Sequence, residues 1–220
     1  MQKPVSSPGG KGTLFTRNFT LLLLGQAASL LGNYTLRFAL SMYVLEKTGS
    51  AGVFGGLLAL SILPTILLTP LGGILADRVN RQRMMVALDA LSGLAVLAAG
   101  LLLGPGRELW VIGGLLAALS VLGAFESPTA QACVPQILGG QNLMAGNAAV
   151  GQVSAAASLI TPFLGSALYA AVGLAPVVWG AAGCFFATAG LECFIRLAPP
   201  AARPAAGAWA ALRGANARTC

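Results

Sequence analysis

The chain has 220 residues, of which 56% are hydrophobic and only 9% are charged, whereas an ordinary soluble domain is about 25% charged. A soluble fold of this length buries only about 70% of its chain surface, so this composition excludes an ordinary soluble domain and predicts a lipid bilayer as partner. The net charge of +7 does not indicate nucleic-acid binding, because the basic residues lie in short segments between apolar runs, as is typical of membrane proteins.

Six apolar runs follow one another along the chain, each long enough to cross about 30 Å of hydrocarbon as a helix of about 20 residues. They cover residues 19–45, 52–76, 84–103, 109–134, 144–172 and 176–197. The sequence therefore predicts an all-α integral membrane protein with six transmembrane helices over 19–197. Residues 1–18 are predicted to form an N-terminal cytoplasmic tail, and 198–220 a cytoplasmic tail or the start of a central linker.

The positive charges predict the orientation of the runs, because Lys and Arg are enriched in cytoplasmic segments. With the N-terminus inside, only Lys47 and Arg107 fall in outer loops. The inner segments hold ten basic residues, namely Lys3, Lys11, Arg17, Arg78, Arg81, Arg83, Arg196, Arg203, Arg213 and Arg218. The sequence thus predicts a multi-pass protein of the cell membrane with both termini in the cytoplasm.

Enzyme chemistry has no support in the sequence. Histidine is absent, which excludes imidazole catalysis and histidine metal sites, and no Walker motif, catalytic triad or metal-ligand cluster appears. We therefore predict no catalytic residues, no metal and no cofactor. The four cysteines are interpreted as small packing residues, since none has CxxC spacing; they are Cys133, Cys184, Cys193 and Cys220.

A polar stripe marks the first apolar run. Gln26, Asn33 and Arg37 are spaced by seven and four residues, which places them on one face of a helix. A polar stripe on an apolar helix should face protein or water rather than lipid. Two readings of Arg37 remain: it extends outward to the near membrane surface, or it faces a cavity and recognises an anionic or polar ligand.

Two further charges lie within predicted spans near the inner face. Asp89 is about one and a half turns into the third run, and Glu126 reaches a similar depth in the fourth. A charge at the centre of a span costs roughly 2.5–3.5 kcal/mol on insertion scales. Each of these two charges is therefore expected to have a binding partner or a function. We consider both as ion-coupling candidates. The alternative for Asp89 is a bond to Arg81 or Arg83, or to water at the inner surface.

A fourth charge, Glu192, lies near the end of the sixth run. Arg196 follows it four residues later. Opposite charges at this spacing meet on one helix face, so the sequence predicts an ion pair between these two side chains near the inner surface.

The loop after the second run carries a motif. Residues 73–83 read GILADRVNRQR, which resembles the signature G-x-x-x-D-R-x-G-R-[RK] of the major facilitator superfamily, at the place where that family has it. Asn80 stands where Gly is usual, and Gln82 stands where a basic residue is usual. The matching residues are Gly73, Asp77, Arg78 and Arg81.

Weaker similarities point to the drug, siderophore and macrolide-efflux branch of that superfamily. Residues 19–33 are similar to its first helix, and residues 47–51 to its first outer loop. Residues 161–166 read TPFLGS, which resembles a degenerate form of the fifth-helix antiporter motif GPxxGG. Together these stretches fall within residues 19–197.

The resemblance implies one six-helix half of a twelve-helix transporter, built of two inverted three-helix repeats, with substrate held between halves at mid-membrane. It implies a small-molecule substrate, a proton or other coupling ion, and a C-terminal half or second copy as partner. The implied function is ion-driven export of a small amphipathic compound. Helices one and four line the cavity in that family, which implies Gln26, Asn33, Tyr34, Arg37 and Glu126 as lining residues. The loop residues Gly73, Asp77, Arg78 and Arg81 are implied to control the outward-open state.

Two other readings remain open. One is the membrane domain of an ATP-driven exporter, which also has six helices but carries long cytoplasmic extensions that these short loops lack. The other is a non-transporting membrane fragment, or an accessory half-size subunit that needs a partner.

Overall fold

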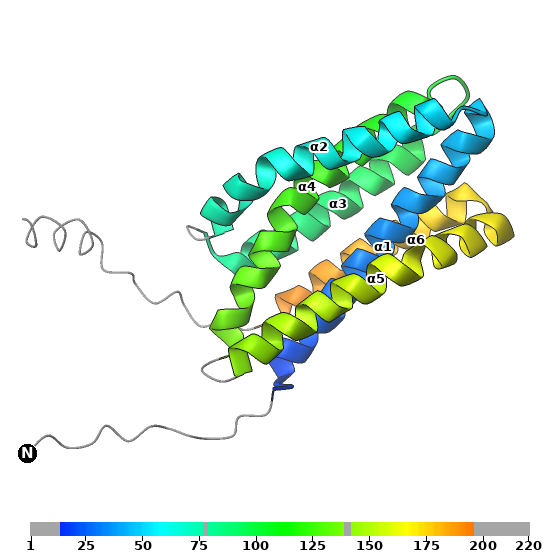
Figure 1. The fold of residues 1–220 in the computed structure, drawn as a ribbon. Helices are drawn as coiled ribbons and strands as arrows, with labels where there is room; N and C mark the ends of the chain where they lie inside the picture. The colour runs from blue at the N-terminus through cyan, green and yellow to red at the C-terminus, as the bar shows by residue number, and fades with distance from the viewer. Residues whose placement is uncertain (1–13, 77–78, 139–141, 196–220) are drawn as a thin grey trace, which may run out of the picture.

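Six helices make up the described part of the fold, a computed structural model that describes residues 14–76, 79–138 and 142–195 (Figure 1). Each coincides with one predicted apolar run to within a few residues. The helices are α1 (Arg17–Thr48), α2 (Ala51–Ala76), α3 (Arg81–Leu102), α4 (Glu108–Ile137), α5 (Asn142–Val172) and α6 (Leu174–Cys193).

The helix ends follow local capping chemistry. The Thr16 hydroxyl accepts a hydrogen bond from the Phe19 amide at 3.3 Å and begins α1. Asn80, which replaces the usual glycine of the loop motif, begins α3 as a side-chain cap. Such caps satisfy amides that have no partner within the helix. Gly49 and Gly173 follow α1 and α5 with φ of 60° and 78°, a left-handed conformation that glycine adopts without a steric penalty.

The helices pair in a regular way. α2 lies along α4, α1 lies along α5, and α3 packs on α6, while α1 also contacts α6 and α3 contacts α4 (Figure 1). Glycine permits two close approaches: a Cβ at Gly72 would lie 2.5 Å from the Ala124 carbonyl oxygen, and one at Gly165 would lie 3.1 Å from that of Thr35. Small residues at such crossings favour tight packing in lipid.

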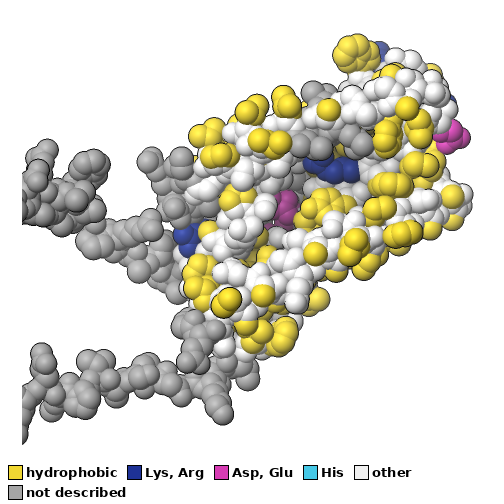
Figure 2. All heavy atoms as spheres, in the orientation of Figure 1, with side chains coloured by type: hydrophobic (Ala, Val, Ile, Leu, Met, Phe, Trp, Pro, Cys, Tyr) yellow, Lys and Arg dark blue, Asp and Glu magenta, His cyan; other side chains and the backbone are white. Residues whose placement is uncertain are grey.

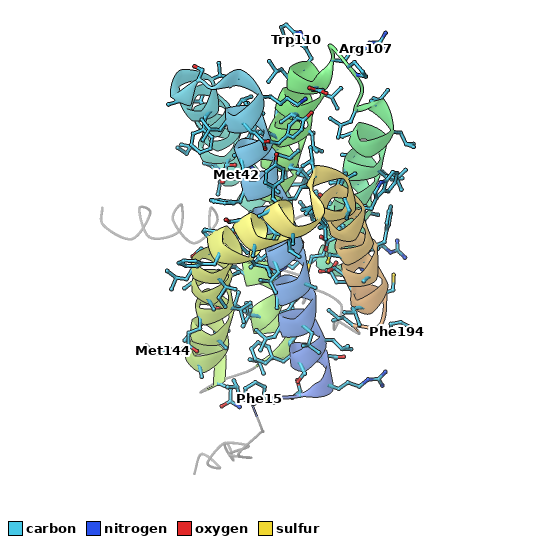
Figure 3. All side chains as sticks on the ribbon, turned by 90° about the vertical axis from the view of Figure 1, so that its right-hand side faces the viewer. Phe15, Met42, Arg107, Trp110, Met144 and Phe194 are labelled. Atoms are coloured by element: carbon cyan, nitrogen blue, oxygen red, sulfur yellow. The ribbon has the colours of Figure 1, made fainter. Side chains whose placement is uncertain are left out.

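Five of these helices, α1, α3, α4, α5 and α6, are long and apolar enough to cross a membrane. The remaining helix, α2, has 26 residues. Among the described residues, its apolar segment is the shorter stretch Leu63–Gly73. Figure 3 shows Arg107 and Trp110 at one end of the bundle and Phe15, Met144 and Phe194 toward the other. The chain is thus an all-α membrane protein whose helices lie side by side along the bundle (Figure 1).

Two apolar clusters fill the interior. The first, here called the Phe185 cluster, joins α1, α3, α4 and α6; the second, the Phe19 cluster, lies nearer the start of α1. Their buried members are Leu36, Leu40, Val44, Val96, Ala99, Ile112, Leu115, Leu116, Leu119, Val178, Ala181, Ala182 and Phe185, and Phe19, Leu22, Met85, Ala130, Cys133, Val134, Leu138, Val150 and Ile195.

A buried polar layer separates these clusters along four helices. Its members, here called the acidic layer, are Ser29 on α1, Asp89 on α3, Glu126 on α4 and Glu192 on α6. Along α1, α3 and α4, the member falls between residues of the Phe19 cluster and residues of the Phe185 cluster; Glu192 falls between Phe185 and Ile195, which follows the end of α6. The layer is therefore enclosed by apolar packing toward both ends of the bundle.

The cysteines follow the prediction only in part. Cys133 is buried in the Phe19 cluster, as expected for a packing residue, and Cys184 is half-buried. Cys193 is exposed, so its interpretation as a packing residue is wrong: it lies on the outer side of the last turn of α6. Cys220 lies outside the described residues.

Candidate substrate cavity and buried acidic layer

A cavity of about 800 Å³ opens on one flank of the bundle, within the range of small-molecule sites. Figure 2 shows basic and acidic side chains inside the hollow between α2 and α4 on one side and α1 and α5 on the other. The lining is Gln26, Leu30, Asn33, Tyr34, Arg37, Thr65, Gly123, Glu126, Ser127, Gln131, Asn147, Val150, Gly151 and Ser154.

All five predicted cavity residues line this one space, namely Gln26, Asn33, Tyr34, Arg37 and Glu126. The spacing of the stripe on the first run therefore located its face correctly. Helix periodicity was sufficient for this, because the stripe is read along a single helix.

Arg37 faces the cavity rather than the near membrane surface. Its Nε donates to Asn33 Oδ1 at 2.6 Å, one turn back on α1, and a terminal nitrogen donates to Ser120 Oγ on α4 at 3.0 Å. Asn33 and Ser120 are both buried. The guanidinium is thus held against the cavity wall by two neutral acceptors and keeps its positive charge available to a ligand.

Glu126 and Asp89 meet through a serine that the sequence did not single out. Ser29 Oγ lies 2.9 Å from Glu126 Oε1 and 2.8 Å from Asp89 Oδ1. Asp89 is fully buried and its second oxygen, Oδ2, has no hydrogen-bond partner. The predicted alternative for Asp89, a bond to Arg81 or Arg83 or to surface water, is therefore wrong, because packing of α3 on α6 and α4 places this side chain inside the bundle.

Glu192 also differs from its prediction. Its expected partner Arg196 lies outside the described residues, and the Glu192 side chain is 0% exposed, with no hydrogen-bond partner at either oxygen. It interacts electrostatically with Asp89 and packs beside Gly25, where an added Cβ would lie 3.6 Å from Glu192 Cγ. The last turn of α6 thus directs a carboxyl group into the interior.

The loop motif is described only in part. Asp77 and Arg78 lie outside the described residues. Gly73 lies in α2 and would accept a Cβ without contact. Arg81 begins α3 and donates to the Ala132 carbonyl oxygen of α4 at 2.8 Å. The start of α3 is therefore tied to α4.

Sequence reasoning missed Ser29, the role of Glu192, and a polar wall on α4 and α5. Ser29 lies three residues after Gln26 and four before Asn33, so helical spacing could have placed it at the edge of the stripe. Gln131, Asn147 and Ser154 gave a weaker signal. Their side chains are uncharged, so burying them in an apolar run costs less than burying a charge and gives a weaker signal.

The site offers a ligand charges of both signs. Arg37 and Glu126 line the same cavity, together with neutral amides and hydroxyl groups. Behind Glu126, the acidic layer brings three of the chain's six acidic residues together. Among the described residues no group of three or more His, Cys, Asp or Glu side chains is arranged to hold a metal ion.

Comparison with known proteins agrees with this geometry. The family model described as Major Facilitator Superfamily matches residues 22–217. The chain is 32% identical over 125 residues to macrolide efflux protein A of Streptococcus pyogenes, a match that covers 54% of this chain and 30% of that protein. It is 33% identical over 197 residues to multidrug resistance protein MdtG of Serratia proteamaculans, covering 84% of this chain and 43% of that protein.

A solved structure shares the fold. The outward-facing bacterial homologue of the iron transporter ferroportin matches with a TM-score of 0.58 and 24% identity, over 80% of this chain and 48% of that one. The chain thus spans less than half the length of each of these proteins. The resemblance of the loop motif is confirmed by these matches: the chain belongs to the major facilitator superfamily of membrane transporters.

Proposed function

We propose that the chain forms one half of a secondary active transporter that exports a small amphipathic compound by alternating access, driven by an ion gradient. The observation that carries this proposal is the cavity of about 800 Å³, which presents Arg37 and Glu126 beside amide and hydroxyl groups. Mixed polar and apolar walls suit an amphipathic ligand. The partial matches to macrolide efflux and multidrug resistance proteins favour export.

In this proposal all six helices span the membrane, as two inverted repeats of three. The pairing pattern supports the repeats, in which α1, α2 and α3 correspond to α4, α5 and α6. The α1–α5 pair then corresponds to the α4–α2 pair, and the α1–α6 pair to the α4–α3 pair. The α3–α6 pair joins two corresponding helices. Exchanging the first three helices with the last three leaves these pairings unchanged. Such repeats are common in transporters of this kind.

Both termini lie in the cytoplasm in this proposal. Arg17 and Arg81 begin α1 and α3, the ends that the positive-inside rule assigns to the cytoplasm. Trp110 lies near the opposite end with 86% of its surface exposed (Figure 3), as suits an aromatic side chain at the outer membrane interface.

The second wall of the cavity comes from a second six-helix unit, which is either a C-terminal half or a second copy of this chain. The cavity is lined by α1, α2, α4 and α5 alone and is open on one flank (Figure 2). The lipid bilayer, the substrate and the coupling ion complete the set of partners. In the chain, residues 1–18 and 198–220 flank the transmembrane domain 19–197 as cytoplasmic segments.

Within this scheme Gln26, Asn33, Tyr34, Arg37 and Glu126 contact substrate, and Asp89 and Glu126 carry the coupling ion. Gly73, Asp77, Arg78 and Arg81 control the conformational change. The hydrogen bond from Arg81 to α4 supports a mechanical role for this loop. We expect Asp77→Asn to leave insertion normal and reduce transport; normal efflux at normal protein level would refute this role.

Transport in everted membrane vesicles tests the function. Vesicles from cells that express the chain are given an inside-acid proton gradient and a labelled macrolide or a fluorescent amphipathic dye. Proton-dependent uptake above that of vesicles without the chain is expected, and it should fall when Glu126→Gln is introduced. No such uptake, with the chain present in the membrane at a normal level, would refute transport by this chain alone.

Crosslinking in the same vesicles tests the partner. A crosslinked dimer across the open flank of the cavity supports the second copy, whereas a monomer indicates a further six-helix unit from another sequence. An inactive chain that gains activity only with such a unit is an accessory half, the alternative function that the open cavity favours.

A further inference from the structure

The acidic layer contains more carboxyl groups than hydrogen-bond donors. Ser29 has one hydroxyl proton, yet its oxygen lies within hydrogen-bonding distance of both Asp89 Oδ1 and Glu126 Oε1. A hydroxyl group donates once and accepts twice. Both contacts are hydrogen bonds only if one of the two carboxyl groups carries a proton and donates it to Ser29 Oγ.

The contact between Asp89 and Glu192 has the same requirement. The two buried side chains act on each other electrostatically, and neither Asp89 Oδ2 nor either Glu192 oxygen has a hydrogen-bond partner. Two ionised carboxylates have no donor between them, and like charges this close repel strongly in an apolar surrounding. A second proton, shared between these groups, satisfies the contact.

Arg37 is a cation that attracts Glu126 electrostatically, but its hydrogen bonds go to other residues, Asn33 and Ser120. The other ionisable groups around the layer are Tyr34 on α1, Cys133 on α4 and Cys193 on α6, and none of these is a cation. The described carboxyl groups are not arranged to surround a metal ion, so a proton is the occupant that fits.

The layer has one side that opens to the cavity. Glu126 lines the cavity, whereas Ser29, Asp89 and Glu192 do not and are fully buried. The Phe185 and Phe19 clusters close the layer toward both ends of the bundle. A proton that reaches Asp89 or Glu192 from the cavity therefore passes through Glu126 and Ser29.

We propose that Asp89 and Glu192 form a buried proton store that exchanges with the substrate cavity through Ser29 and Glu126, with Glu192 as its innermost member. The proposal rests on the ion coupling proposed above and names the ion and its path. In the transfer step the Glu126 O–H bond breaks as Ser29 Oγ accepts that proton. The original Ser29 proton moves to Asp89 Oδ1, so a neutral serine remains and the negative charge moves from Asp89 to Glu126.

Infrared spectroscopy of the purified full chain tests the store without substrate or transport. A protonated carboxylic acid gives a C=O stretch that an ionised carboxylate lacks. We expect this band at neutral pH in the wild type, with one component lost in Glu192→Gln and another in Asp89→Asn. Glu46→Gln, which changes an exposed carboxyl group at the end of α1, should leave the band unchanged. The proposal is overturned if Glu192→Gln and Asp89→Asn retain the whole wild-type band.

The path is tested by transfer to D₂O. The carboxylic-acid band should shift more slowly in Ser29→Ala, by on the order of 100-fold, because a positioned proton-transfer group contributes at least this much. Ser29→Thr retains a hydroxyl group and should restore fast exchange. Wild-type exchange in Ser29→Ala would overturn the relay. A band without transport would overturn only the proposed function, and transport without the band would overturn only the proton store.

Discussion

The Phe185 cluster and the acidic layer are built from the same four helices, α1, α3, α4 and α6, yet they differ in every chemical respect. The cluster is apolar and buried, whereas the layer holds three carboxyl groups, of which Asp89 and Glu192 have oxygens without a hydrogen-bond partner. Burying such groups destabilises a fold. The comparison indicates that the cluster provides stability and that the layer is retained for its chemistry, as expected for ionisable groups inside membrane helices.

The largest effect on stability is expected from a substitution in the Phe185 cluster. Phe185→Ala should lower the free energy of unfolding by about 3–5 kcal/mol, because it leaves a cavity in the cluster. Phe163→Ala is the matched control, since Phe163 on α5 is 78% exposed and should cost much less. Unfolding in detergent, followed by circular dichroism, measures both. Equal losses would show that the cluster is not the stabilising core.

A substitution in the acidic layer should change stability in the opposite direction. Glu192→Met replaces a buried carboxyl group, whose oxygens have no hydrogen-bond partner, by an apolar side chain of similar length. Burying an unbonded polar group costs about 1–3 kcal/mol, so the replacement should stabilise the bundle by up to this amount. We expect a higher unfolding temperature together with loss of proton-driven transport. A clear loss of stability instead would mean that Glu192 contributes to the packing of the bundle.

A smaller effect is expected at the cavity wall. Arg37→Gln should weaken binding of an anionic or polar ligand by about tenfold, which corresponds to 1.4 kcal/mol, while the unfolding temperature stays close to that of the wild type. Lys47→Gln is the control, since Lys47 is exposed near the end of α1. Ligand titration by tryptophan fluorescence measures both variants. Equal affinities in the two would place the ligand away from Arg37.

The smallest effect is expected at the end of the bundle where α1 ends. The Tyr169 hydroxyl of α5 donates to a Glu46 carboxylate oxygen of α1. Because the bond is exposed, Tyr169→Phe should cost no more than about 1 kcal/mol and should leave transport unchanged. A transport defect in this variant would extend the functional region beyond the cavity and the acidic layer.

The helices themselves could be predicted because each run is a property of local sequence. The polar stripe through Gln26, Asn33 and Arg37 was located for the same reason: residues of one helix share a face by periodicity alone. Asn80 shows the limit of motif reading, since it departs from the family pattern but begins α3 as a side-chain cap.

The acidic layer could not be predicted, because its contacts join helices far apart in the chain. Ser29 and Glu126 are 97 residues apart, and no pattern within either run fixes their relative rotation. For Glu192, the spacing of opposite charges four residues apart on a helix predicted Arg196 as the partner. Packing of α6 against α1 and α3 turned the side chain inward instead.

The measurement that tests the central claim most directly is uphill uptake by Asp89→Asn in everted vesicles with an inside-acid gradient. Asp89 does not line the cavity, so substrate binding should stay close to that of the wild type. We expect the variant to bind substrate and equilibrate it downhill but no longer to accumulate it against a gradient. Uphill accumulation at the wild-type level, with equal amounts of protein in the membrane, would contradict the assignment of proton coupling to the acidic layer.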